Sequence, residues 1–147
     1  MPVKELGHVV LFVEDLARSR SFYRDLLGFH EILHLRDRMA AFSSGRTHHE
    51  LLLIAVGPAQ PIPQGRRLGM YHFGLKVGDS DEELKAMLDQ LREAGIHVTG
   101  ASDHGVTHSL YVLDPDGNEI ELYIDVPGVD WKDAPALFMQ PPKPLKL

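Results

Sequence analysis

The chain has 147 residues, 44% of them hydrophobic, which suffices for a substantial core and predicts one domain over residues 1–147. Its net charge of -6 and scattered basic residues predict no nucleic-acid partner. No apolar run approaches the roughly 20 residues of a membrane helix, and no signal-peptide pattern opens the chain, so we expect a cytoplasmic protein with no membrane partner. With no cysteine and nine histidines, any metal must be bound by nitrogen and oxygen ligands.

Residues 5–57 form a first predicted module. Alternating apolar residues predict a strand over 6–13, Asp15 is a candidate helix N-cap, and Gly28 suits the end of that helix. The predicted buried stripe of the helix is Leu16, Ser19, Phe22, Tyr23, Leu26 and Leu27. Three further strands are expected over 31–35, 39–43 and 48–56. The order of elements is therefore β-α-β-β-β.

Residues 58–69 form a Pro-rich connector, and residues 70–126 form a second module of the same kind. Its helix is predicted to begin at a capping box, in which Ser80 and Glu83 satisfy exposed backbone donors, and to end at Gly95. Strands are expected near 97–99, 108–113 and 119–124. The Pro-rich tail, 127–147, offers three candidate packing anchors, which are Trp131, Leu137 and Phe138.

The two modules open on one pattern, His-x-x-Leu-x-Val, which begins at His8 in the first and at His72 in the second. Self-similarity at long period indicates two copies of one structural unit. We therefore predict an α+β fold in which two β-α-β-β-β modules form a curved mixed sheet around a metal-binding cavity.

Two histidines and a carboxylate from separate strands form a triad that suits Fe(II) or Mn(II). His8, His72 and Glu121 fit this description if all three point into the cavity. Each of them alone is more simply explained as a structural or solvent-facing residue. The equivalent placement of His8 and His72 in two related modules favours the metal site.

Residues 7–29 and 114–122 resemble the vicinal oxygen chelate superfamily, which includes glyoxalase I, fosfomycin-resistance proteins and extradiol dioxygenases. The narrower resemblance is to single-domain extradiol dioxygenases of the catechol 2,3-dioxygenase kind. It implies metal ligation by the triad and active-site roles for His49, His104 and Tyr111. Because the chain is two residues shorter than some members before Tyr111, His108 remains an alternative to His104.

The resemblance implies an enzyme that cleaves a catechol-like aromatic diol with O2 in aromatic catabolism, using Fe(II), with Mn(II), Ni(II) or Zn(II) as alternatives. In the chemistry expected, an imidazole near neutrality, His49, exchanges protons with the substrate. One alternative is a glyoxalase I-like isomerase or lyase with Glu50 as a fourth metal ligand. Another is a resistance-type protein that binds a small molecule without turnover.

Neighbouring side chains on a strand point to opposite faces, so His49 and Glu50 cannot both enter the cavity without a bulge. We predict that His49 points inward and that Leu51 and Leu53 share its side as an apolar wall. Glu50 then points away and needs an arginine or a backbone donor as partner. The edge strands and the apolar tail favour a homodimer.

Overall fold

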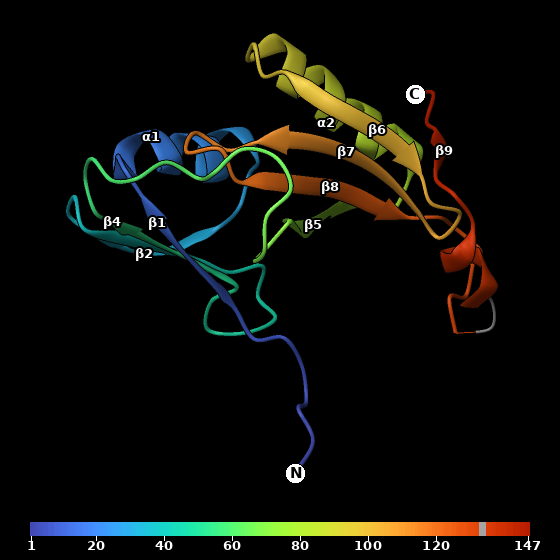
Figure 1. Ribbon diagram of the computed structural model, residues 1–147, viewed down its shortest axis with the longest axis horizontal. Helices are drawn as coiled ribbons and strands as arrows, with labels where there is room; N and C mark the ends of the chain where they lie inside the picture. Colours follow the sequence, from blue (N-terminus) through green and yellow to red (C-terminus); the bar gives the residue numbers. More distant parts are fainter. Residues whose placement is uncertain (133–134) are drawn as a thin grey trace. The chain divides into compact units, whose positions relative to one another are not determined.

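The structure is a computed structural model that describes residues 1–132 and 135–147. The chain divides into two compact units, Met1–Ile62 and Pro63–Leu147. The boundary falls inside the Pro-rich segment 58–69. Each unit contains one mixed β-sheet with helical structure (Figure 1).

Unit 1 contains a four-stranded sheet in the order β1-β4-β3-β2. Strand β1 (Val9–Val13) runs parallel to β4 (Leu51–Ala55), whereas β3 (Met39–Phe42) is antiparallel to both β4 and β2 (Glu31–Leu35). The predicted β-α-β-β-β order is confirmed. Strands β1 and β4 are shorter than the predicted 6–13 and 48–56, and His8, His49 and Glu50 lie just outside them.

The helical segment of unit 1 begins where the sequence predicts. The side chain of Asp15 caps α1 (Leu16–Arg20) by accepting a hydrogen bond from Arg18 N at 3.1 Å. The chain then continues as a π-helix, η1 (Ser21–Leu26), a form that the sequence pattern did not predict. The wider turn lets the adjacent Phe22 and Tyr23 both be buried, with their rings in edge-to-face contact 5.0 Å apart.

The register of unit 1 separates a buried face from an open one, because paired residues of a sheet share a face. The buried face packs under the helical segment and contains Leu11, Val13, Ala40, Phe42, Leu51 and Leu53. We call the opposite surface the open face of unit 1. Its residues are Val10, Phe12, Leu33, Leu35, Met39, Ala41, Leu52 and Ile54.

The predicted apolar wall of Leu51 and Leu53 is wrong. Both side chains are buried in the core of unit 1, at 1% and 0% exposure. The prediction assumes that the strand, with its two-residue alternation of faces, already includes His49, but β4 begins only at Leu51. The irregular segment before it breaks the two-residue period, so His49 need not share a face with Leu51.

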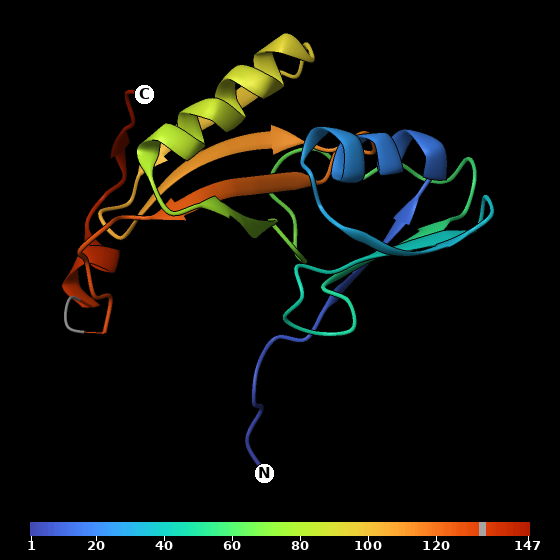
Figure 2. The same cartoon turned by 180° about the vertical axis from the view of Figure 1, so that it is seen from behind.

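Unit 2 contains a five-stranded sheet in the order β5-β8-β7-β6-β9. Its strands are β5 (His72–Gly78), β6 (Val98–Asp103), β7 (Thr107–Leu113), β8 (Glu119–Asp125) and β9 (Lys143–Pro144). Helix α2 (Asp81–Glu93) lies along one face of this sheet (Figure 2) and buries Leu84, Leu88 and Leu91. The module order is again β-α-β-β-β, with β9 as an addition.

The capping box of α2 is confirmed. Ser80 accepts a hydrogen bond from Glu83 N at 3.3 Å, and the Glu83 carboxylate accepts one from Asp79 N at 2.6 Å. Gly78 permits this close packing, because a Cβ atom there would lie 2.6 Å from the Glu83 Cβ. A side chain at position 78 would therefore displace the start of the helix.

The tail contributes η2 (Pro135–Met139) and strand β9, which pairs with the edge strand β6. Leu137 packs near Gly105, as its Cβ lies 3.6 Å from the position that a Gly105 Cβ would occupy. Trp131 is 57% exposed, and the Phe138 side chain lies outside the part of the chain that the structure describes. Within residues 1–132 and 135–147, no helix is both long and apolar enough to cross a membrane.

Candidate functional site

A cluster of three histidines lies at the end of the unit 1 sheet where β1 and β4 begin. The rings of His8 and His49 are 4.4 Å apart between centroids, and those of His48 and His49 are 4.5 Å apart. The Nδ1 atoms of His48 and His49 are within hydrogen-bond distance at 2.6 Å. The fold of unit 1 alone therefore brings two of the predicted site residues, His8 and His49, together.

The surroundings of His49 favour its neutral form. Partial burial lowers the pKa of this imidazole, and the neighbouring His8 and His48 lower it further, against an opposing effect of Glu50. A neutral imidazole keeps a lone pair with which to accept a proton or bind a ligand.

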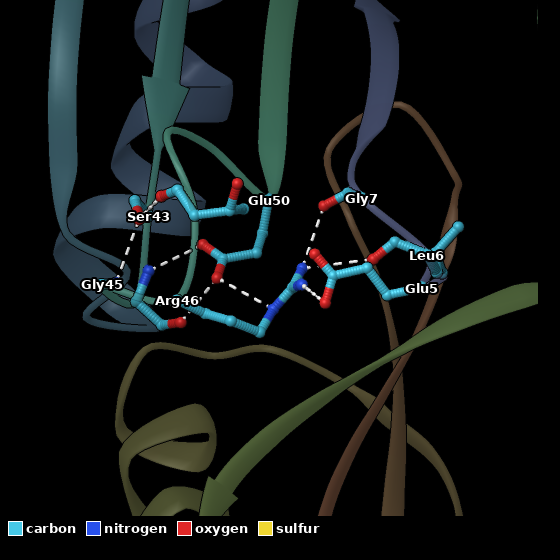
Figure 3. Close-up of polar contacts among 9 residues, drawn as sticks. Glu5, Leu6, Gly7, Ser43, Gly45, Arg46 and Glu50 are labelled. Atoms are coloured by element: carbon cyan, nitrogen blue, oxygen red, sulfur yellow. Dashed lines mark hydrogen bonds and ion pairs between the residues drawn. The ribbon is translucent and has the colours of Figure 1, made fainter. Parts of the chain in front are cut away.

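Glu50 points into a polar cluster of its own (Figure 3). Its carboxylate accepts hydrogen bonds from the backbone N–H and the hydroxyl of Ser44, both at 2.8 Å, and lies 3.4 Å from Arg46 Nε. Burial on its own would raise the pKa of Glu50, but these donors outweigh it and lower the pKa. The predicted need for an arginine or backbone partner is thus met by both. Neither Ser44 nor Arg46 was singled out from the sequence, although Arg46 stands four residues before Glu50.

Unit 2 joins four predicted site residues into one chain of polar contacts. Glu121 Oε2 lies 3.2 Å from His72 Nε2, and Glu121 Oε1 accepts a hydrogen bond from the Tyr111 hydroxyl at 3.1 Å. The same hydroxyl lies 2.8 Å from His104 Nε2. Because its single proton is donated to Glu121, His104 Nε2 must be the donor in that contact. The order is therefore His104, Tyr111, Glu121, His72.

Sheet register explains why these side chains meet. Tyr111 and Glu121 are direct partners on β7 and β8, and Gly74 is the partner of Glu121 on β5. Paired residues project to the same face, so Tyr111 and Glu121 both lie on the face opposite to α2. We call this surface the open face of unit 2. A Cβ atom at Gly74 would lie 3.1 Å from the Tyr123 ring and 3.7 Å from Glu121 Oε2, so glycine leaves room beside the carboxylate.

The Tyr111 hydroxyl is held in its protonated form. Burial raises its pKa well above the usual value, and the charge of Glu121 and the hydrogen bond to it raise it further. Tyr111 is therefore a hydrogen-bond donor at neutral pH.

The two candidate histidines after β6 have different partners. His104 contacts Tyr111, whereas His108 Nδ1 lies 2.6 Å from Asp81 at the start of α2 and His108 Nε2 lies 3.5 Å from Asp103. In the register, His108 pairs with the buried Ile124 and so projects to the helix side. These contacts bring His104, and not His108, to the chain of polar contacts that ends at His72.

The donor set of unit 2 fits a divalent metal. A carboxylate oxygen and an imidazole nitrogen converge at 3.2 Å, and His72 Nδ1 is buried without a hydrogen-bond partner among residues 1–132 and 135–147. Glu119, at 3.5 Å from that Nδ1, was not singled out from the sequence, although the alternation of Glu119 and Glu121 puts both on one face.

No group of three or more histidine and carboxylate side chains among residues 1–132 and 135–147 is arranged to hold a metal ion. The predicted triad takes His8 from unit 1 and His72 and Glu121 from unit 2. Its completion by His8 therefore remains a prediction from the repeat. The structure does show that the nitrogen and oxygen donors of unit 2 have the chemistry that such an ion requires.

A separate groove of about 930 Å³ opens in unit 1, between the start of α1 and the β2–β3 turn. Its lining includes Arg18, Arg36 and Arg38 but none of the predicted site residues. It therefore does not identify the site of chemistry.

The chain belongs to the Glyoxalase/Bleomycin resistance protein/Dioxygenase superfamily, whose family model matches residues 5–122. The superfamily that the sequence resembles is thereby confirmed, and the two sheets confirm the α+β fold with two β-α-β-β-β modules.

Within the superfamily, the chain is 36% identical over 127 residues to a catechol-2,3-dioxygenase from Bacillus subtilis, covering 86% of this chain and 44% of the relative. It is 33% identical to biphenyl-2,3-diol 1,2-dioxygenase 3 from Rhodococcus globerulus, covering 82% and 63%. A lactoylglutathione lyase structure from Agrobacterium tumefaciens superposes with a TM-score of 0.63 at 26% identity, covering 84% and 96%. The chain thus spans about half to two thirds of the two dioxygenases, and its relatives include both dioxygenase and lyase chemistry.

Proposed function

We propose that this chain is a metal-dependent extradiol-type dioxygenase that cleaves the ring of a catechol-like diol with O2. The observation that carries the proposal is the chain His104, Tyr111, Glu121, His72 on the open face of unit 2. The similarity to two diol dioxygenases supports the same reaction class. His8 is proposed as the third metal ligand beside His72 and Glu121.

A bound Fe(II) ion would supply open coordination positions and electrons for the reaction of the diol with O2. The residues of the chain bind and move protons around it. Neutral His49 accepts a proton from a diol hydroxyl. Tyr111 and His104 would orient a substrate oxygen by turning toward it the hydrogen bonds that they donate to Glu121 and to Tyr111 in the metal-free protein.

The glyoxalase-like alternative requires Glu50 to bind the metal. In unit 1 its carboxylate already accepts two hydrogen bonds from Ser44 and pairs with Arg46, so ligation would require these contacts to be given up. The similarity to a lactoylglutathione lyase keeps this reaction as the second candidate. A homodimeric state, a cytoplasmic location and the choice of iron over manganese, nickel or zinc remain predictions.

The deciding experiment measures O2 consumption by the anaerobically Fe(II)-reconstituted protein with a panel of catechols. The proposal predicts O2 uptake together with a coloured ring-opened product. Turnover of a glutathione hemithioacetal without O2 uptake would support the lyase reaction instead. Tight binding of a diol with neither metal nor turnover would support the resistance-type binding protein.

A further inference from the structure

Arg46 joins two segments of unit 1 that are far apart in sequence (Figure 3). Its Nη2 atom donates to the carbonyl of Gly7 at 2.9 Å and to that of Leu6 at 3.3 Å. Its Nε atom lies 3.4 Å from Glu50, and its Nη1 atom lies 3.3 Å from the Glu5 carboxylate. One guanidinium therefore binds both the segment before His8 and the segment after His49.

Glu50 anchors the other end of this connection. Its side chain is only 15% exposed and its carboxylate is held by Ser44, while its backbone is hydrogen-bonded on both sides just before β4. Glu50 N donates to Phe42 O at 2.9 Å, and Glu50 O accepts from Val9 N at 2.8 Å. Arg46 thus connects the chain before His8 to a residue whose position is fixed from both its side chain and its backbone.

The two residues next to these contacts are His8 and His49. His8 directly follows Gly7, His49 directly precedes Glu50, and their rings lie 4.4 Å apart. His8 is exposed and lies just outside β1, and the Val9 N–H that follows it is bonded to Glu50 O. On the other side of His8, the contacts of Arg46 to the carbonyls of Leu6 and Gly7 restrain the chain.

We propose that Arg46 is a positioning residue that sets the place of His8 relative to His49 by binding Glu50 and the carbonyls of Leu6 and Gly7 together. Glu50 is then an anchor for Arg46 and not a metal ligand. The inference rests on the proposed function for the roles of His8 and His49 in metal binding and proton transfer. The arrangement of the two rings itself can be measured in the metal-free protein.

The arrangement needs the shape of a guanidinium and not only its charge. Three different nitrogen atoms of Arg46 contact four acceptors in different directions. A lysine ammonium is a point charge on a flexible stem and cannot reproduce this fork. Arg46→Lys should therefore restore only part of what Arg46→Gln loses.

The first test is made on the full chain without metal. Nuclear Overhauser contacts between the His8 and His49 rings should be present in the wild type and lost in Arg46→Gln. The Val9 amide should exchange its hydrogen roughly tenfold faster in that variant, because its acceptor segment is loosened. Arg38→Gln is the matched control, since Arg38 is an exposed arginine of the same unit, and both signals should be unchanged in it. Unchanged ring contacts and exchange in Arg46→Gln would overturn the proposal.

The second test measures the affinity for Co(II), the metal alone, by calorimetry. Arg46→Gln should weaken binding roughly 10- to 100-fold, the range expected when a residue that orients a ligand is lost. Glu50→Gln should do the same, and the double variant should be no weaker than either single variant because both act through one connection. A much larger loss in Glu50→Gln that persists in the Arg46→Gln background would show Glu50 to be a ligand and overturn the proposal.

The two tests separate this inference from the proposed function. If the wild type binds no metal but Arg46→Gln still disrupts the ring contact, the metal centre is wrong and the role of Arg46 stands. If metal binds and Arg46→Gln alters neither the rings nor the affinity, the metal centre stands and the role of Arg46 is wrong.

Discussion

The open faces of the two sheets differ in chemistry although the two units repeat one fold. Unit 1 presents only apolar side chains on its open face, from Val10 and Phe12 on β1 to Leu33 and Leu35 on β2. Unit 2 presents a face rich in polar and ionisable residues. They include His72, Lys76, Ser109, Tyr111, Glu119, Glu121 and Tyr123.

The faces that pack under the helices are alike in both units and are built mainly of aliphatic and aromatic residues, with Glu31 in unit 1 and His108 in unit 2 as ionisable exceptions. The alternate residues of each strand that face the core therefore determine the fold in both units. The residues on the other face are free to differ, because substituting them changes the buried apolar area only a little. In unit 1, ionisable residues lie at the end of the sheet, in the histidine cluster and the contacts of Arg46, and on the helix side, in the ion pair of Arg20 with Glu31.

The assignment of strand residues to a buried and an open face is tested most strongly by truncating two neighbouring residues of β1. Leu11 is 6% exposed, whereas Phe12, the next residue, is 70% exposed. Leu11→Ala should lower the free energy of unfolding by about 2–5 kcal/mol, because it leaves a cavity in the core. Phe12→Ala should change it by less than about 0.5 kcal/mol. Denaturant titration of both variants measures the difference, and equal losses would show that the faces are wrongly assigned.

A second prediction concerns the polar face of unit 2. Tyr111→Phe removes the hydroxyl between His104 and Glu121, so Glu121 is less well oriented. Metal affinity or catalytic rate should fall roughly 10- to 100-fold with little change in stability. Tyr123→Phe, on the same face one strand away, is the matched control and should retain the wild-type values. The same loss in both variants would show that the effect comes from the face in general and not from the Glu121 contact.

A smaller effect is expected from removing an ion pair on the helix side of the unit 1 sheet. Arg20 donates two hydrogen bonds to Glu31, at 2.6 and 2.7 Å, with both side chains largely buried. The hydrogen bonds from Arg20 lower the pKa of Glu31 against the opposing effect of burial. A depressed folded-state pKa stabilises the protein above the unfolded value of about 4.3, and that stabilisation is lost as the pH falls through the folded pKa.

Glu31→Gln should therefore lower stability by about 1 kcal/mol at pH 7 and flatten its dependence on pH in the acid range. Denaturation curves between neutral and strongly acidic pH measure this. Asp25→Asn breaks a more exposed pair with Arg24 and serves as the control. If Glu31→Gln kept the wild-type dependence of stability on pH, the acid sensitivity would come from other carboxylates.

Much of the fold could be predicted because its signals are local or repeated. The caps at Asp15 and Ser80 depend on neighbouring backbone donors, and the repeat of His8 at His72 specifies a second copy of the module. The π-helix could not be predicted, because burial of both Phe22 and Tyr23 depends on the sheet beneath them. The pairing of β9 with β6 joins residues some 40 positions apart and leaves no sequence pattern in a Pro-rich tail.

The candidate site divides in the same way. Tyr111 and Glu121 could be placed together because strand alternation and an antiparallel turn define their register. The side chains around Glu50 could not be placed, because the segment from Ser44 to Glu50 is irregular and lacks the two-residue alternation of a strand. That failure also produced the wrong assignment of Leu51 and Leu53.

The metal content of reconstituted protein after removal of free metal tests most directly whether the polar face of unit 2 contributes metal ligands. We expect about one divalent ion per chain in the wild type and almost none in His72→Ala. His97→Ala, which removes an exposed histidine of the same unit, should keep the wild-type content. A wild-type metal content in His72→Ala would show that His72 is not a metal ligand.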